Sequence, residues 1–331
     1  VLGFLVGAGF AFAGAGASSP MLGLMIAPLF ALPFILPGEL RRSVGGAVDR
    51  ARLKAYAAYG YPIAASLTLA LVLASTDRFL LAAFMDAAAV GAYHASYSLA
   101  NRTLDVMFIW LGAAGAPAMV MALERGGREA LRQTALEQGS TLILIGLPAA
   151  VGLALVARPM AELMIGEPLR VAATLVTPWI AASAFLSGMI AYYFGFGFTL
   201  GKKTGLLLVT MAIPAATNVV LNLVLIPRLG VVGAAMATAL SFAIGLIACL
   251  MLSRRAIALP VPWDSLIRCG LASAIMAGVV SLLPPLGGLV ELIMDASVGG
   301  LVYAAAALTL NAAGVRDVLM RLIRTRRGAP A

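Results

Sequence analysis

The stretch Asp77–Asp105 concentrates ionisable and polar side chains in a chain that is otherwise apolar. In a helix, residues four positions apart share a face. Two neighbouring stripes result, one of Tyr93, Tyr97, Asn101 and Asp105 and the other of His94, Ser98 and Arg102. Ionisable groups at membrane depth face a bundle interior or a watery cavity rather than lipid. We therefore expect this stretch to line a cavity. The candidate substrate-binding residues on it are Asp77, Arg78, Tyr97, Asn101, Arg102 and Asp105.

The charged residues of this stretch also have structural interpretations. Asp77 and Arg78 could form a pair near the membrane interface, which the long side chain of Arg78 can reach. Arg102 and Asp105 are three positions apart, so they could neutralise each other on one helix. Because a charge near the middle of a span is expensive to insert, we favour a cavity-lining role for Arg102 and Asp105.

A second polar stripe follows later in the chain and consists of Thr210, Pro214, Asn218 and Asn222. An asparagine that faced lipid would leave its amide group without a partner. Asn218 and Asn222 therefore either make hydrogen bonds between helices or recognise sugar hydroxyls in a passage. The first interpretation is the simpler, and both remain candidates.

Composition sets the fold class. The chain has 331 residues, of which 62% are hydrophobic and 11% are charged. Since roughly 20 apolar residues cross a bilayer as a helix, the continuous apolar runs predict an all-α, polytopic membrane protein with about ten spans. The spans are expected near residues 1–17, 20–38, 55–84, 88–123, 139–156, 171–200, 205–226, 231–252, 267–283 and 289–312.

Basic residues alternate between the connections. Most of the 23 Lys and Arg fall in every second connection and in the carboxyl-terminal tail. The positive-inside rule makes that side cytoplasmic, so the net charge of +9 reflects membrane topology rather than nucleic-acid binding. The prediction is a multi-pass membrane protein with a cytoplasmic carboxyl terminus. Cys249 and Cys269 fall near this side, where a structural disulfide is not expected.

Motifs for catalysis are missing from the sequence. There is no glycine-rich phosphate loop and no cluster with metal-ligand spacing, and His94 is the single histidine. We therefore expect a protein that is not an enzyme and has no metal or cofactor.

Two segments resemble a known family. The first is D-R-F-L-L, a short acidic turn and then A-V-G-A-Y-x-x-x-Y-x-L-A, and the second is TNVVLNLVLIPRLGVVGAAMATALSF. They are similar to the polysaccharide and O-antigen flippases (Wzx-type) of the multidrug/oligosaccharidyl-lipid/polysaccharide exporter superfamily. The resemblance implies a two-lobed bundle like that of the multidrug exporters, here incomplete, and a flippase of undecaprenyl-diphosphate-linked glycans. It places Arg78 and Arg102 where a diphosphate or an acidic sugar would bind. Membrane lipids and a glycan polymerase or export machinery are the implied partners, and the coupling ion stays open.

The same resemblance divides the chain. Residues 1–38 would be the last two helices of an amino-terminal lobe whose four preceding helices are missing. Residues 39–54 would be a basic cytoplasmic linker, 55–252 a six-helix carboxyl-terminal lobe, and 253–331 two additional helices with a basic tail.

Two other functions stay open at this point. One is a multidrug or cation antiporter of the same superfamily, which needs a buried carboxylate such as Asp77 or Asp105. The other is a membrane glycosyltransferase or polymerase, although the external connections are too short to build the active site that such an enzyme needs.

The topology can be tested with an impermeant thiol reagent in intact cells. We expect a cysteine placed at Ala87 to be labelled and one placed at Arg327 to be protected, because the two positions lie on opposite sides. Equal labelling would contradict the predicted topology.

Overall fold

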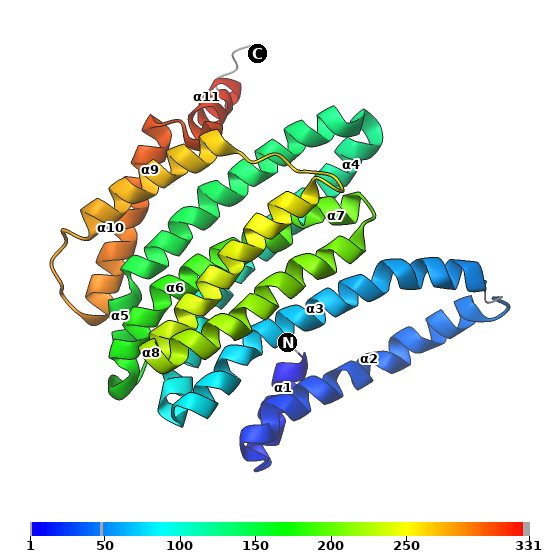
Figure 1. Ribbon diagram of the computed structural model, residues 1–331, viewed down its shortest axis with the longest axis horizontal. Helices are drawn as coiled ribbons and strands as arrows, with labels where there is room; N and C mark the ends of the chain where they lie inside the picture. The colour runs from blue at the N-terminus through cyan, green and yellow to red at the C-terminus, as the bar shows by residue number, and fades with distance from the viewer. Residues whose placement is uncertain (1, 47–48, 327–331) are drawn as a thin grey trace. The chain divides into compact units, whose positions relative to one another are not determined.

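The computed structural model describes residues 2–46 and 49–326, which form helices and turns without a strand (Figure 1). Arg327, at the end of the predicted basic tail, lies outside the described residues. The main helices are α1 (Leu2–Phe12), α2 (Ser19–Ser43), α3 (Arg50–Phe84), α4 (Ala87–Leu155), α5 (Ala157–Met164), α6 (Arg170–Met189), α7 (Phe196–Leu200), α8 (Thr204–Ser253), α9 (Trp263–Val280), α10 (Gly288–Thr309) and α11 (Val315–Arg326).

Two long helices each contain a sharp break at a glycine. The φ angle is 68° at Gly127 in α4 and 58° at Gly230 in α8, a region that glycine adopts without steric cost. Each helix therefore consists of two limbs, 87–126 and 128–155 in α4, and 204–229 and 231–253 in α8. Six of the described helices are long and apolar enough to span a membrane. With the limbs taken separately, the helical segments are compatible with the ten expected spans, which confirms an all-α, polytopic membrane protein.

The chain divides into two compact units, Val1–Ala57 and Ala58–Ala331. In the first, α1 and α2 pack through glycines, and a Cβ on Gly23 would overlap the carbonyl oxygen of Gly3. Since α2 ends at Ser43 and α3 begins at Arg50, much of the basic segment 39–54 is helical. The predicted division into lobes stays a prediction.

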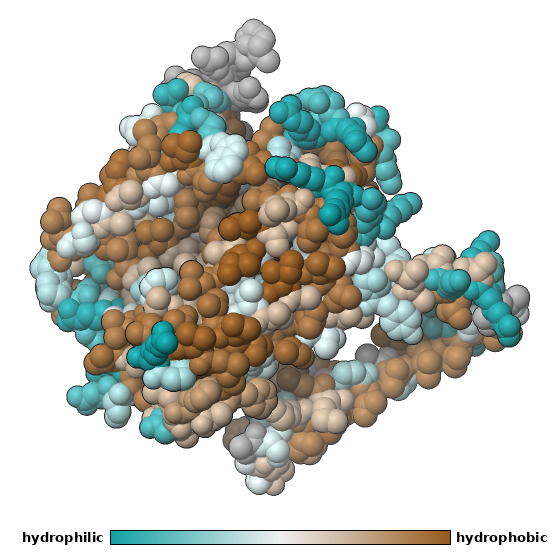
Figure 2. Space-filling model, in the orientation of Figure 1, coloured by the Kyte–Doolittle hydropathy of each residue, from teal (hydrophilic) through white to brown (hydrophobic). Residues whose placement is uncertain are grey.

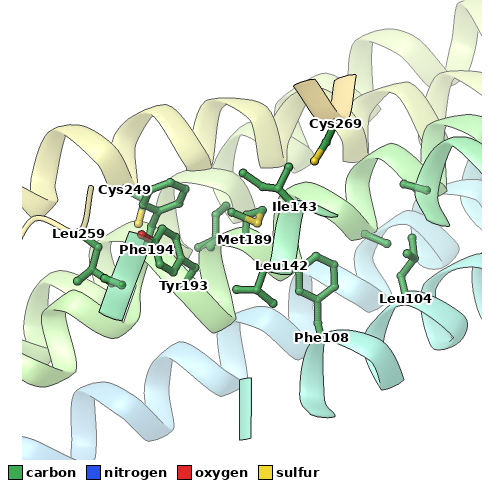
Figure 3. Packing of buried hydrophobic residues seen from close by; sticks show 14 of the residues in the cluster. Leu104, Phe108, Leu142, Ile143, Met189, Tyr193, Phe194, Cys249, Leu259 and Cys269 are labelled. Atoms are coloured by element: carbon green, nitrogen blue, oxygen red, sulfur yellow. The ribbon is translucent and has the colours of Figure 1, made fainter. Parts of the chain in front are cut away.

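The core of the second unit lies between the limbs of α4, α6 and α8. Phe108 is fully buried, and its ring fits against Gly146 and Gly188, where an added Cβ would overlap it. Leu142, Met189 and Tyr193 belong to the same cluster (Figure 3). The glycines thus allow the helices to approach closely around a large aromatic side chain.

The surface of this unit has the polarity expected in a bilayer. Hydrophobic residues cover the middle of the face shown, and hydrophilic residues gather towards the ends of the helices, including the bend of α4 (Figure 2). Val171 is 74% exposed and Leu301 is 72% exposed. So large an apolar surface indicates contact with lipid.

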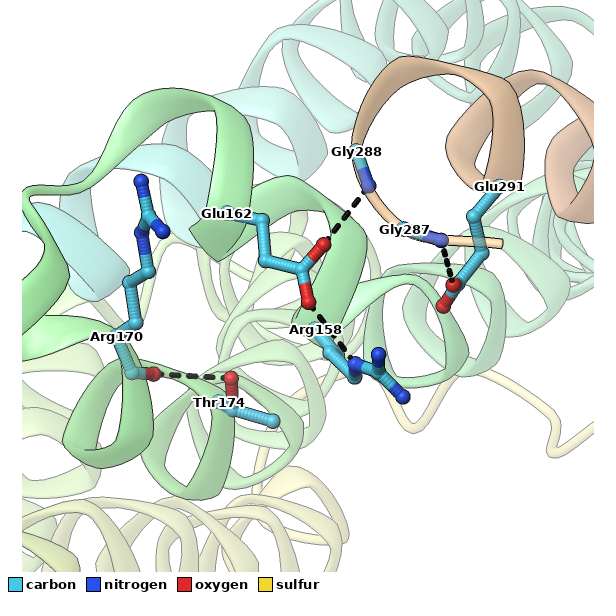
Figure 4. A network of polar contacts seen from close by, with 7 residues as sticks. All are labelled: Arg158, Glu162, Arg170, Thr174, Gly287, Gly288 and Glu291. Atoms are coloured by element: carbon cyan, nitrogen blue, oxygen red, sulfur yellow. Dashed lines mark hydrogen bonds and ion pairs between the residues drawn. The ribbon is translucent and has the colours of Figure 1, made fainter. Parts of the chain in front are cut away.

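Short polar contacts fix the end of this unit that is predicted to be external. Glu162 on α5 accepts the backbone N–H of Gly288 at 2.7 Å and the Nε–H of Arg158 at 3.0 Å (Figure 4). The Gly288 amide, followed by Arg158, lowers the pKa of the Glu162 carboxyl below its usual range. Glu291 accepts the N–H of Gly287 at 2.7 Å. The Glu162–Gly288 bond ties α5 to the start of α10, and the Glu291–Gly287 bond closes the first turn of α10.

The two limbs of α8 lie in close contact. Gly233, Ala237, Ser241 and Gly245 are buried at four-residue spacing on the second limb. A Cβ on Gly233 would overlap the carbonyl oxygen of Leu225 on the first limb, and one on Gly245 would lie 3.0 Å from the ring of Pro214. This small-residue seam sets the distance between the polar residues that the two limbs carry.

We expect Gly233→Ala to lower the free energy of unfolding by about 1–3 kcal/mol, because backbone atoms cannot move aside for the added methyl group. Gly205→Ala on the same helix is the matched control, since a Cβ there meets no atom within 4 Å. Unfolding in detergent, followed by circular dichroism, measures both variants. Equal stability of the two proteins would contradict the close approach of the limbs.

Candidate functional site

A buried carboxylate, that of Asp77 on α3, lies at the centre of the candidate site. Asp77 has no exposed surface. Its Oδ2 accepts the hydroxyl of Tyr93 at 2.5 Å and that of Thr238 at 2.7 Å, and its Oδ1 accepts Nδ2–H of Asn222 at 2.6 Å. We call Asp77, Tyr93, Asn218, Asn222 and Thr238 the Asp77 cluster.

Four helical segments supply this cluster. Tyr93 lies near the start of α4, which Asp86 caps by accepting the N–H of Ala89 at 2.8 Å. Asn218 and Asn222 share a face of the first limb of α8, and Thr238 comes from the second limb. The cluster therefore exists only when α3, α4 and both limbs of α8 are packed together.

One acceptor atom of the cluster is left without a donor. Both N–H groups of Asn222 are used, one on Asp77 and one on Oδ1 of Asn218 at 2.9 Å. Its own Oδ1 is buried without a hydrogen-bond partner. Among the described residues, no Lys, Arg or His makes an ion pair with Asp77. A buried carboxylate without a counter-charge is costly, so the geometry suits a proton or a small cation held by these oxygens.

The described residues show no site of the kind that binds zinc or copper. In the part of the chain that the structure describes, no three His, Cys, Asp or Glu side chains converge. The amide and carboxylate oxygens of the Asp77 cluster are hard ligands, which suit hard cations rather than zinc or copper.

Arg78 does not pair with Asp77, contrary to one interpretation of the sequence. Adjacent residues of a helix point in different directions, and Arg78 lies with its guanidinium carbon 5.1 Å from the centroid of the Tyr97 ring. That ring is in turn 6.0 Å from the ring of Tyr93. Nε of Arg78 is buried and has no hydrogen-bond partner. This arrangement is a cation–π contact with Tyr97 rather than an ion pair with Asp77.

Asn101, Arg102 and Asp105 lie further along α4. Nδ2 of Asn101 donates to Oδ2 of Asp105 at 2.5 Å, and both residues are partly buried. Arg102 is exposed, and the described residues include no ion pair within 4.0 Å that involves it. The pairing of Arg102 with Asp105 that the spacing allowed is thus replaced by an amide–carboxylate bond, which leaves the guanidinium free to bind an anion.

An apolar groove touches the same helix. Its volume is about 350 Å³, and α4, α9 and α10 supply its lining, which includes Thr103, Gly152, Met276, Gly299 and Tyr303. The Tyr303 hydroxyl donates to the carbonyl of Leu144 at 2.7 Å, so its ring is fixed. Because Thr103 follows Arg102, one end of the groove lies on the helix that carries the exposed guanidinium.

The structure brings together some of the residues selected from the sequence. Asp77, Asn218 and Asn222 meet directly, whereas Asn101 and Asp105 form a separate pair that no hydrogen bond links to the Asp77 cluster in the described chain. Tyr93 and Thr238 were not selected. Tyr93 had a signal, since it shares the stripe of Tyr97, but nothing in the sequence distinguished Thr238 from the small residues around it.

Comparisons with known proteins agree with this architecture. The pattern of a family described as "Polysaccharide biosynthesis protein" matches residues 1–174. The fold is similar to a solved structure entitled "Lipid II flippase MurJ, inward closed conformation", with a TM-score of 0.69 and 14% sequence identity. The alignment covers 96% of this chain and 67% of that chain. A search of curated protein sequences gave no match.

The bond between Asn101 and Asp105 predicts unequal effects of two neighbouring substitutions. Asn101→Ala should lower the free energy of unfolding by about 1–2 kcal/mol, because it leaves a partly buried carboxylate without its donor. Arg102→Ala should leave stability within about 0.5 kcal/mol of the parent protein, as is usual for an exposed side chain. Unfolding of both variants in the same detergent tests this. If Arg102→Ala is the more destabilising, Arg102 is the structural counter-ion of Asp105 after all.

Proposed function

This chain belongs to the polysaccharide biosynthesis protein family, and we propose that it is a transporter that flips lipid-linked oligosaccharides across a membrane. The substrate would be a glycan on a polyprenyl diphosphate such as undecaprenyl diphosphate. The observation that carries this proposal is that α4 bears both the exposed guanidinium of Arg102, which has no ion pair in the described chain, and Thr103, which lines the apolar groove. A lipid diphosphate needs a cation for its phosphates and an apolar surface for its chain, and α4 contributes to both.

The two arginines have different roles in this proposal. Arg102 is exposed and can form paired hydrogen bonds with phosphate oxygens, as a guanidinium does best. Arg78 is held against the Tyr97 ring, and its positive charge would attract the anionic substrate without a direct ion pair. Asn101 and Tyr97, on the same stripe of α4, would contact the hydroxyl groups and the faces of the sugars.

Transport against a gradient needs an energy source, and the Asp77 cluster supplies the coupling group. Binding of a proton or a small cation would neutralise the carboxylate. Release of that cation would leave a buried charge among α3, α4 and both limbs of α8. The free-energy cost of that buried charge would favour a rearrangement of these helices. Because α4 carries both Tyr93 and Arg102, it would transmit the rearrangement to Arg102. Which cation is used is an outcome of the test below.

A drug or cation antiporter is the second candidate, and the buried carboxylate is the observation in its favour. Asp77 has no exposed surface, so it offers no contact surface to a larger organic cation. We therefore assign the carboxylate to coupling rather than to substrate binding. The proposed setting is the bacterial inner membrane, with the carboxyl terminus in the cytoplasm and a glycan polymerase or export machinery as partner.

The test is a flipping assay in vesicles that contain the purified full-length protein and a polyprenyl-diphosphate glycan. An impermeant glycosidase measures how much glycan reaches the outer surface under a proton gradient or a sodium gradient. We expect flipping to depend on one gradient. Asp77→Asn keeps the size of the side chain but removes its charge, so it should reduce gradient-driven flipping at least about tenfold. An effect of this size lies in the lower part of the range that is typical of coupling between two sites.

Asp86→Asn is the matched control. It makes the same chemical change at an exposed cap, where asparagine serves as well as aspartate, so flipping should stay near the parent rate. Folded protein that moves no glycan under either gradient would contradict the proposed function. Full gradient dependence in Asp77→Asn would remove Asp77 from the coupling role but would leave the flippase proposal intact.

A further inference from the structure

A separate cavity lies at the end of the second unit where α4 bends at Gly127. Its volume is about 480 Å³, and it lies between the start of the second limb of α4 and the connection from α8 to α9. Three arginines line it, namely Arg128, Arg132 and Arg254. Figure 2 shows hydrophilic residues gathered around this end of the molecule.

The wall formed by the α8–α9 connection is held in place. Tyr193 donates its hydroxyl to the carbonyl of Pro260 at 2.7 Å, and Nζ of Lys203 donates to the carbonyl of Arg255 at 2.6 Å. A Cβ on Gly197 would overlap the carbonyl oxygen of Ile257. Leu259 is buried in the core cluster that contains Tyr193 (Figure 3). The cavity is therefore part of the packed structure and not a gap beneath a loose loop.

The cavity carries an excess of positive charge. Glu129 is the one carboxylate among the described residues that line it, and it lies 3.6 Å from Arg132. Arg128 and Arg254 have no carboxylate within 4.0 Å in the described chain. The positive-inside rule would be satisfied by basic residues at any position on this side of the membrane. Here arginines from two distant segments converge on one cavity, and unpaired guanidinium groups are the side chains best suited to phosphate.

The residues next to the cavity are of the types found at the membrane–water boundary. Trp263, three residues after Pro260, is 63% exposed, and exposed tryptophan is typical of the membrane–water boundary. One and two turns further along α9, Ile267 and Leu271 are also exposed, as a lipid-facing surface requires. Leu131 and Ile257 give the cavity itself an apolar portion.

We propose that this cavity binds the phosphate of an anionic phospholipid from the leaflet on the basic, predicted cytoplasmic side. Basic pockets between helices on that side are suited to such headgroups. The site would hold a resident lipid across the α4 bend and the α8–α9 connection. It does not depend on what the protein transports.

The test uses the purified full chain in detergent and measures bound phosphatidylglycerol by native mass spectrometry. Phosphatidylethanolamine serves as the zwitterionic lipid, and inorganic phosphate as a competitor. We expect Arg128→Gln/Arg132→Gln/Arg254→Gln to bind phosphatidylglycerol at least about tenfold more weakly, because each arginine near a headgroup contributes measurably to affinity. Ala258→Glu keeps every arginine but adds a carboxylate to the lining, and it should weaken binding similarly.

The control variant Arg41→Gln/Arg42→Gln/Arg50→Gln removes the same charge from the same predicted side, outside the cavity. Its affinity should stay near that of the parent protein, and phosphatidylethanolamine should bind weakly to all four proteins. Equal weakening in the control would show diffuse attraction and would overturn the site, as would unchanged binding in Ala258→Glu. Displacement of the lipid by millimolar inorganic phosphate would assign the cavity to a soluble anion instead. If the triple variant does not fold, Ala258→Glu decides the question alone.

Discussion

The buried carboxylate of Asp77 is the constraint on which the packing of the second unit depends. An ionised carboxylate without water must be surrounded by donors, and here these come from Tyr93 on α4, Asn222 on the first limb of α8 and Thr238 on the second. The limbs of α8 can both reach it because the chain turns at Gly230 and packs closely at Gly233. A change in the charge of this group is therefore felt by four helical segments at once.

The fold class followed from simple features of the sequence. Continuous apolar runs required helices, and alternating basic connections fixed their number approximately. The sequence did not show that α4 and α8 continue almost without a loop through Gly127 and Gly230. A connection with basic residues looks the same whether it is a loop or a helix that bends at one glycine. The difference depends on how the following limb packs, which is a tertiary property.

The candidate site was predicted in part, and the reason is geometric. Asn218 and Asn222 could be placed on one buried face because helical periodicity is a local rule. The pairing of Asp77 with Tyr93 and Thr238, by contrast, joins residues 16 and 161 positions apart, and no local rule reports such contacts. Arg78 seemed a natural partner for Asp77 from the sequence, but neighbouring side chains on a helix diverge. The donors that satisfy the carboxylate accordingly come from other helices.

Binding of the coupling cation by the Asp77 cluster is tested most directly by thermal unfolding of the purified chain across a series of sodium concentrations and pH values. A cation that binds the folded state alone stabilises it increasingly as its concentration rises. We expect the unfolding midpoint of the parent protein to rise with sodium or with proton concentration. This dependence should be lost in Asp77→Asn and retained in Asp86→Asn. The same dependence in all three proteins would show that the bound cation lies elsewhere and would rule out the Asp77 cluster as its site.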